Sequence, residues 1–182
     1  ISAPCLDHMG FWMQQRLGIK PAGMKQVLRQ LKHSWYIGFF QIPVIAPTLW
    51  RNFGHKLWPL ILKNKENIDD AKPNPTQAQD GEYGVNLYKA NMLKRVLYPQ
   101  ERYTRIPVQV IIVTDDNFMI PDIWQGIEKW VSDLSIVEMT GGHWLILNKP
   151  KEFANYVQKF VNNIEQKKLD NDSRLAQFRA QK

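Results

Sequence analysis

Two loops of this sequence carry residue types that could act together in acid–base chemistry. Asp115 and Asp116 follow the apolar run 108–113, and His143 follows two glycines behind a second apolar run, 134–139. A carboxylate that orients an imidazole and stabilises its protonated form allows the imidazole to act as a general base. Asp116 and His143 are 27 residues apart, which leaves room for one helix and one strand between them. On spacing alone, either residue could instead be an ordinary turn or helix-capping residue.

These loops need strands to position them, and the second half of the chain predicts two. The run 108–113 is nearly all β-branched and follows a proline, which is typical of a strand buried on both faces of a parallel sheet. A second short strand is predicted at 134–139. Apolar residues recur at helical spacing over 123–131 and again over 153–164. The order strand, helix, strand, helix predicts the α/β class, in which ligands lie at the carboxyl ends of the strands.

The first half is predicted to be mostly helical. We expect irregular chain over 1–10, an amphipathic helix over 24–31 and an aromatic block bounded by prolines over 34–43. A helix interrupted at Pro59 is expected over 50–62, a polar loop over 63–80 and a third helix over 84–97. Two strands are too few for a complete core, so we expect the chain to be a fragment of a longer protein.

The predicted organisation has three parts. Residues 1–97 form an N-terminal segment and helical region, 98–166 carry the strands, and 167–182 form a charged tail or linker in which the apolar period fades.

Composition narrows the class of protein. A single cysteine, Cys5, excludes an intrachain disulfide and favours a reducing compartment, so we expect a cytoplasmic location. The net charge is +7, but no stripe of Lys and Arg interleaves with aromatic residues, which favours a solvated surface over a nucleic-acid partner. No apolar stretch is long enough to span a bilayer. No cluster of residues has metal-ligand spacing, so no metal or organic cofactor is expected.

The two loops resemble those of the α/β-hydrolase family. The segment from Asp116 to Pro121 resembles the family's acid loop, where an Asp is followed within five residues by a Pro that opens a helix. Gly142-His143-Trp144, followed by Lys149-Pro150, resembles the family's His loop. The order acid and then His is also the family's order. The resemblance implies that His143 is the catalytic base and Asp116 its acid partner, with Asp115 as the alternative acid.

The helical half resembles the cap of epoxide hydrolases within that family. Tyr36 lies five residues ahead of Gln41-Ile-Pro43, and Tyr88 lies in a segment, 86–92, that resembles the second cap-tyrosine segment. The resemblance implies a partial α/β-hydrolase fold in which Tyr36 and Tyr88 hold the epoxide oxygen. Opening a strained ether creates an alkoxide, and two phenols can bind and protonate it.

One part of the family's machinery is absent from this sequence. The family's nucleophile is an Asp in a Gly-x-Asp-x-Gly elbow, and no such segment occurs among the 182 residues. The resemblance therefore implies an epoxide-hydrolase-like enzyme in the complete protein, and a fragment that is inactive alone. Aromatic residues of the cap and the His loop suggest that the substrate is lipophilic and contacts Trp35, Phe39, Phe40, Trp50 and Trp144.

Several alternatives stay open on the sequence. The complete protein could be another capped hydrolase: a haloalkane dehalogenase, for which Trp35 would suit a halide, or an esterase with a Ser nucleophile. The chain could also be the hydrolase part of a fusion with a short-chain dehydrogenase, joined through 167–182, or an inactive truncated module. The oligomeric state is not readable from the sequence.

Overall fold

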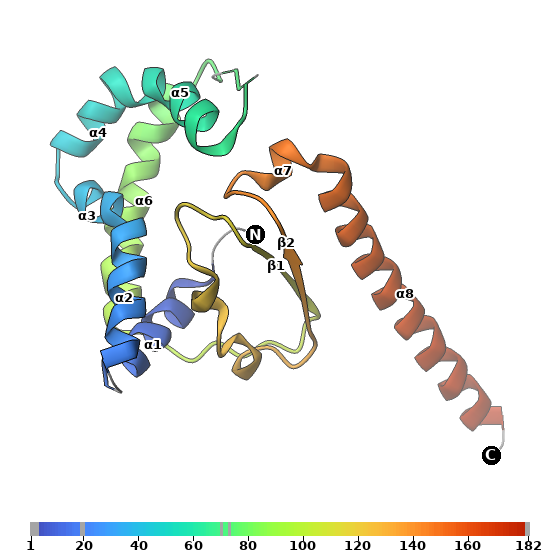
Figure 1. Cartoon of the computed structure of the whole chain (residues 1–182). Coiled ribbons are helices and arrows are strands. Elements are labelled where there is room, and N and C mark those ends of the chain that lie inside the picture. Colours follow the sequence, from blue (N-terminus) through green and yellow to red (C-terminus); the bar gives the residue numbers. More distant parts are fainter. Residues whose placement is uncertain (1–3, 19–20, 70, 73, 181–182) are drawn as a thin grey trace.

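The chain forms a helical half followed by a two-stranded parallel sheet and a long final helix (Figure 1). The computed structural model describes residues 4–18, 21–69, 71–72 and 74–180, with side chains of the last helix through Ser173. The helical half contains α1 (Leu6–Leu17), α2 (Pro21–His33), α3 (Trp35–Phe40), α4 (Ile45–Leu49), the π-helical turn η1 (Trp50–Gly54), α5 (His55–Glu66) and α6 (Gln77–Leu97). The second half contains β1 (Val108–Val113), the 3-10 turns η2 (Pro121–Trp124) and η3 (Ile127–Lys129), β2 (Leu134–Met139), α7 (Leu145–Asn148) and α8 (Pro150–Ala180).

The sheet is parallel, as the sequence predicts. Val108 pairs with Leu134 and Val113 with Met139, so the two strands end at the same edge. Alternate residues of β1 face opposite sides. Val110 and Ile112 join a core with Met9 and Trp12 of α1, whereas Ile111 packs with Met139 and Leu145 on the other side.

The sequence-based prediction was wrong for residues 6–10. Residues 1–10 were expected to be irregular, but α1 begins at Leu6 after the extended residue Cys5, and residues 1–3 lie outside the described part of the chain. Asp7 occupies the first turn, where a carboxylate is favourable, and the opposite side of the helix buries Met9 and Trp12. Too few apolar residues lie within 1–10 to reveal this face.

The single helix expected over 123–131 is also absent. Gln125 is extended and Gly126 has a φ of 92°, so the chain breaks into η2 and η3. Glycine adopts this left-handed conformation without a steric penalty. Apolar periodicity alone could not show the break.

The predicted polar loop at 63–80 is shorter than expected, because α5 continues to Glu66 and α6 begins at Gln77. Pro59 lies inside α5, where its missing N–H removes one helical hydrogen bond without ending the helix. At the other end, residues 167–180 continue α8 (Figure 1), and Lys167 pairs with Asp133 just before β2 (3.2 Å). None of the described helices combines the length and apolarity that crossing a membrane requires.

Trp50 packs directly onto the backbone of α6 at Gly81. A Cβ at Gly81 would overlap the Trp50 indole, whereas a Cβ at Gly84, one turn further along the same helix, would meet nothing within 4 Å. We expect Gly81→Ala to lower the free energy of unfolding by about 1–3 kcal/mol, since the indole must move. Gly84→Ala is the matched control and should be neutral or stabilising by up to about 1 kcal/mol. Urea denaturation of both variants checks this, and equal stabilities would contradict the packing.

His8 of α1 is a buried structural histidine. Its Nε2 donates to the carbonyl of Ile123 (2.8 Å) and its Nδ1 accepts from the indole N–H of Trp130 (3.1 Å), which is possible only for the neutral ring. Burial lowers the pKa of His8 below its ordinary value of 6.5, more than the Ile123 carbonyl and Glu128 raise it; Arg16 and Lys129 lower it further.

This histidine predicts a dependence of stability on pH. Below about pH 6.5 His8 binds a proton in the unfolded chain but stays neutral in the folded chain. Stability therefore falls as the pH drops toward the folded-state pKa of His8. The expected slope from this group is at most about 1.4 kcal/mol per pH unit. Denaturation of the wild type and His8→Gln at pH 7.5 and 5.5 measures it. The His8→Gln variant should lose this contribution and the control His33→Gln should keep it; the reverse would refute the assignment.

Candidate active site

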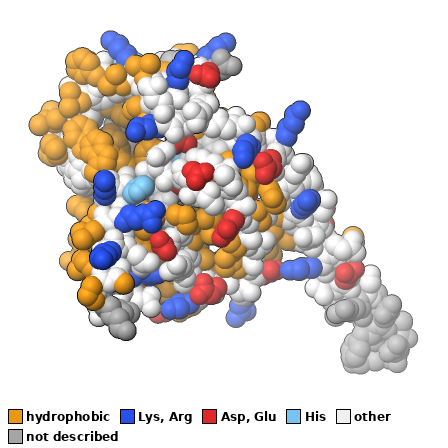
Figure 2. Space-filling model, viewed as in Figure 1, with side chains coloured by type: hydrophobic (Ala, Val, Ile, Leu, Met, Phe, Trp, Pro, Cys, Tyr) orange, Lys and Arg blue, Asp and Glu red, His pale blue; other side chains and the backbone are white. Residues whose placement is uncertain are grey.

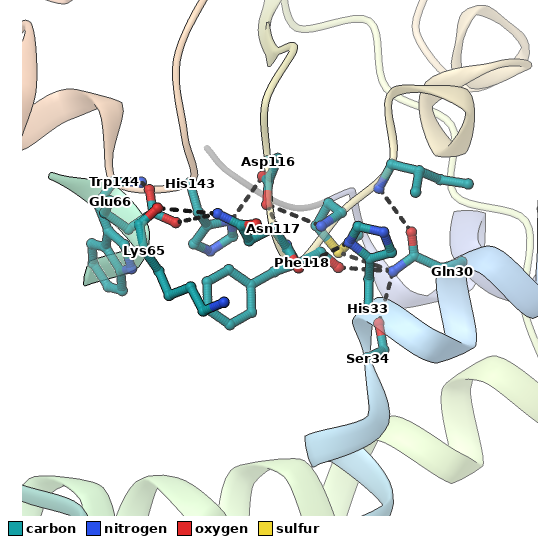
Figure 3. A network of polar contacts seen from close by, with 12 residues as sticks. Gln30, His33, Ser34, Lys65, Glu66, Asp116, Asn117, Phe118, His143 and Trp144 are labelled. Carbon is teal, nitrogen blue, oxygen red and sulfur yellow. Dashed lines mark hydrogen bonds and ion pairs between the residues drawn. The ribbon is translucent and has the colours of Figure 1, made fainter. Parts of the chain in front are cut away.

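The acid loop and the His loop meet at the carboxyl edge of the sheet. Backbone pairing continues past the strands, because Thr114 N donates to Met139 O (3.1 Å) and Asp115 N to Gly141 O (3.0 Å). These hydrogen bonds fix the positions at which both loops leave the sheet relative to one another. The side chains of Asp116 and His143 then turn toward one another (Figure 3).

Asp116 and His143 form a hydrogen-bonded pair. His143 Nδ1 lies 2.8 Å from Asp116 Oδ2, and the side chains of His143 and Asp116 are 20% and 2% exposed. The other carboxylate oxygen of Asp116 accepts from the backbone N–H groups of Phe118 (2.7 Å) and Met119 (3.0 Å). Asp116 is thus fixed as an acceptor, so Nδ1 of His143 donates to it and Nε2 is left with a lone pair. This is the geometry of a base and its orienting acid, and Asp115, the alternative, is exposed.

Two buried residues of the cap hold the acid loop and the His loop in place, and the sequence reasoning missed both. Glu66, at the end of α5 and 3% exposed, accepts from the backbone N–H of Trp144 (3.2 Å) and from the side-chain amide of Asn117 (3.3 Å). Its backbone carbonyl also accepts from Asn148 (2.6 Å). A Cβ at Gly142 would overlap the Glu66 carboxylate, so the glycine before His143 makes room for it.

Gln30 of α2 is the second of these residues. It is fully buried, accepts from Ile120 N (2.9 Å), and donates to Phe118 O (2.9 Å) and to Ser34 Oγ (2.7 Å) (Figure 3). Its amide therefore satisfies hydrogen-bonding groups of the acid-loop backbone on the side away from Glu66.

One signal in the sequence could have pointed to Glu66: it is the first acidic residue after Asp7.

Tyr36 and Tyr88 lie next to one another and close to the pair formed by Asp116 and His143. Their ring centroids are 6.1 Å apart, and Tyr36 contacts Phe118, whose ring lies 4.8 Å from that of His143. Burial raises the pKa of the Tyr36 phenol well above its usual range, and the neighbouring Tyr88 and Asp116 add to the shift. Tyr36 therefore stays protonated and can act as a hydrogen-bond donor near neutral pH.

Ring contacts close into a circle around these residues. We call the following eight side chains the aromatic cluster; neighbouring ring centroids are 4.8–6.4 Å apart: His143, Phe118, Tyr36, Tyr88, Phe40, Trp50, Trp58 and Trp144. Phe39 contacts the cluster through Phe40 (6.0 Å). The indole nitrogen of Trp144 is buried and has no hydrogen-bond partner among the described residues.

Trp35 stands apart from the other predicted substrate residues. It is 71% exposed, and among the described residues no ring contact joins it to the aromatic cluster. Trp50, which was also predicted, lies in the cluster, and Trp58 joins it there. The sequence did not single out Trp58, because one more Trp in an amphipathic helix is ordinary core.

Solved structures share this arrangement of cap and strands. The chain matches two crystal structures of an epoxide hydrolase from Bacillus megaterium, one of a mutant and one in complex with an inhibitor, with TM-scores of 0.57 and 0.58 and 24% identity. Each match covers 83% of this chain and 56% of the other. The chain has the fold of the C-terminal part of an α/β-hydrolase.

Sequence comparison finds longer relatives. The chain is 24% identical over 173 residues to the protein named probable oxidoreductase EphD in Mycobacterium bovis and Mycobacterium tuberculosis. The match covers 89% of this chain but 28% of those relatives. No protein-family model matches the chain. The chain thus spans little more than a quarter of the length of the curated relatives and about half of that of the solved structures.

Proposed function

We propose that this chain supplies the base, its acid partner and the oxygen-binding tyrosines of an enzyme that hydrolyses lipophilic epoxides. The observation that carries the proposal is the convergence of His143, held by Asp116 at 2.8 Å, with the Tyr36 and Tyr88 pair on one side of the cap. A base without the two phenols would suit any capped hydrolase. Two adjacent phenols suit a reaction in which one oxygen leaves carbon while still attached to the substrate.

The proposed reaction has two steps. A carboxylate oxygen of an Asp elsewhere in the complete protein attacks an epoxide carbon, forming an ester as the C–O bond of the epoxide breaks. The released alkoxide is stabilised and protonated by the phenols of Tyr36 and Tyr88. His143 then takes a proton from water through Nε2, the hydroxide attacks the ester carbonyl, and the bond between the acyl carbon and the ester oxygen breaks, so that the diol leaves with that oxygen of the Asp. Of the two protons of the water, one restores the tyrosine phenol and the other completes the diol hydroxyl. Asp116 stabilises the imidazolium that forms during this second step.

The aromatic cluster supports a lipophilic substrate. Rings from α3, η1 and α5 lie beside the His loop, and they present apolar faces with a few polar atoms. Such a combination is typical of sites that orient an apolar ligand through a small number of hydrogen bonds. Phe39, Phe40, Trp50 and Trp144 are the proposed contacts, whereas the exposure of Trp35 gives it less support.

We further propose the division into 1–97, 98–166 and 167–182 and a cytoplasmic location. The division is supported by the change from helices to strands after α6, and the location by the single cysteine.

A single-turnover experiment in H₂¹⁸O tests the mechanism. Excess complete protein containing this chain is mixed with a lipophilic epoxide, and the first diol is analysed by mass spectrometry. The ester route predicts that the oxygen added to the diol in the first turnover comes from the Asp and is therefore ¹⁶O. Label in the first diol would refute the ester. Residues 1–182 alone should show no turnover, and epoxide opening by this chain that persists in His143→Ala would contradict the proposal.

A second candidate is a hydrolase unit within an oxidoreductase. It is favoured by the name of the mycobacterial relatives, probable oxidoreductase, and by the 28% of their length that the chain spans. A reading frame that continues past Lys182 into a Gly-x-x-x-Gly-x-Gly segment would support it. In that case the hydrolase test above applies unchanged to this part of the protein.

A further inference from the structure

The continuous helical segment formed by α4, η1 and α5 carries two apolar rows, and only one of them is buried. The inner row repeats every four residues and packs toward α6 and the aromatic cluster; it consists of Ala46, Trp50, Gly54, Trp58 and Leu62. The outer row lies one residue earlier, or two in the case of Leu60, and is 41–59% exposed; it consists of Ile45, Leu49, Phe53, Leu57 and Leu60. We call this outer row the exposed apolar stripe.

The π-helical turn keeps this stripe straight. In an α-helix a spacing of four residues overshoots one turn, so a row at this spacing slowly winds around the helix. A π turn holds more residues than an α turn, and η1 lies in the middle of the row. Its wider turn offsets the drift, so the stripe from Ile45 to Leu60 faces one direction.

The helical segment that carries the stripe is basic. Residues 45–65 contain no Asp or Glu, and their basic residues are Arg51, Lys56, Lys63 and Lys65. Two of these make exposed ion pairs with acids outside the segment, Arg51 with Glu82 (3.5 Å) and Lys63 with Asp69 (3.4 Å). Figure 2 shows orange side chains gathered over the upper left, where α3 and α4 lie in Figure 1, with blue side chains at the upper edge.

We propose that the exposed apolar stripe docks this protein onto an anionic lipid bilayer surface. A helix that lies in the plane of a membrane has an exposed apolar face bordered by Lys and Arg, and these features coincide at the stripe. Each basic residue near an anionic surface adds to the attraction. Docking leaves the helix parallel to the bilayer and needs no membrane-spanning segment.

The positive charge of the segment argues against two other partners for the stripe, a second copy of this chain and another part of a longer protein. In a symmetric dimer the same patch meets itself, so the stripes of two copies would bring Lys56 and Lys65 of one copy near those of the other. An anionic bilayer complements the same charges. If another part of a longer protein packed on the stripe, that part would have to supply acidic groups around an apolar surface. Comparing the membrane binding of this chain with that of the complete protein distinguishes this case.

Vesicle flotation tests the proposal. Residues 1–182 and the complete protein are each mixed with vesicles of phosphatidylcholine alone or with about one third phosphatidylglycerol. We expect both proteins to float with the anionic vesicles, with partitioning at least about ten-fold weaker on neutral vesicles and reduced by high salt. Equal binding to both vesicles, or none to either, would overturn the proposal. Binding by the chain but not by the complete protein would instead assign the stripe to a contact within that protein.

Matched variants locate the surface. Leu57→Glu should reduce partitioning by about ten-fold or more, because a leucine that would be buried in the bilayer is replaced by a charge that the anionic surface repels. Leu169→Glu is the control, on an exposed face of α8 with similar exposure (60%, against 53% for Leu57). Lys56→Glu should reduce partitioning by about five-fold or more and the control Lys151→Glu much less. Equal losses of partitioning in the target variants and in the controls would refute membrane docking at this stripe. So would a dimer, detected by light scattering, that Leu57→Glu converts to a monomer.

Discussion

Replacing His143 with glutamine is expected to stop the proposed reaction after the ester has formed. Glutamine can still donate to Asp116 but cannot accept a proton from water. Loss of a general base costs about 10²–10⁴-fold in rate, so turnover in the complete protein should fall by about that factor. Because the first step does not use His143, the ester should accumulate and be detectable as a mass increase equal to that of the substrate.

Asp116→Asn separates orientation from base chemistry at the same site. An amide in this position can turn its N–H₂ toward His143 and favour the wrong tautomer, at a cost of up to about 10⁴-fold. His33→Gln is the matched control, because His33 Nδ1 donates to the carbonyl of Asn117 (2.9 Å) in the same loop and glutamine can keep that bond. Its rate should stay within about two-fold of wild type. Full activity of His143→Gln, or an equal loss in His33→Gln, would show that the base lies elsewhere.

The second large effect is expected at Glu66. Glu66→Ala leaves the backbone N–H of Trp144 without its acceptor, whereas the exposed side chain of Asn117 keeps its bond to the carbonyl of Lys65 (3.2 Å). An unpaired buried donor costs about 1–3 kcal/mol, so the free energy of unfolding should fall by about that amount. Glu165→Ala, an exposed glutamate of α8, is the control and should change stability by about 0.5 kcal/mol or less.

Stability alone would not show that Glu66 acts on the site, so a second measurement is needed. The Nδ1–H proton of His143 gives an NMR signal that depends on its hydrogen bond to Asp116. We expect this signal to broaden or vanish in Glu66→Ala and to persist in Glu165→Ala under conditions where both chains are folded. Glu66→Gln keeps one oxygen acceptor, so its His143 signal should be intermediate between that of the wild type and that of Glu66→Ala. An unchanged His143 signal in folded Glu66→Ala would restrict Glu66 to a structural role.

The strands and their loops were predictable because their signals are local. The β-branched run 108–113 and the shorter run 134–139 have the observed bounds of β1 and β2. Their parallel pairing brings together the residues that follow them, which is why Asp116 and His143 meet. Tyr36 and Tyr88 could be proposed from short motifs for the same reason.

Features that depend on distant contacts were not predictable. Glu66 looks like the end of an exposed helix until α5 is placed beside the two loops. Helix α1 was missed because its apolar side is recognisable only against β1, and the break at Gly126 depends on one backbone angle. The exposed apolar stripe was also not predictable, because only the folded segment formed by α4, η1 and α5 shows which of its apolar residues are exposed.

The contacts of Gln30 and Glu66 have a consequence for how this architecture can vary. Both residues belong to the cap, yet their side chains end on the backbone of the acid and His loops. A helical half with other side chains at these two positions would leave the backbone of both loops without these partners, and the alignment of His143 with Asp116 would suffer. Exchange of the helical half for another therefore has to keep Glu66 together with Gly142 and Asn117, the residues that it meets in the loops.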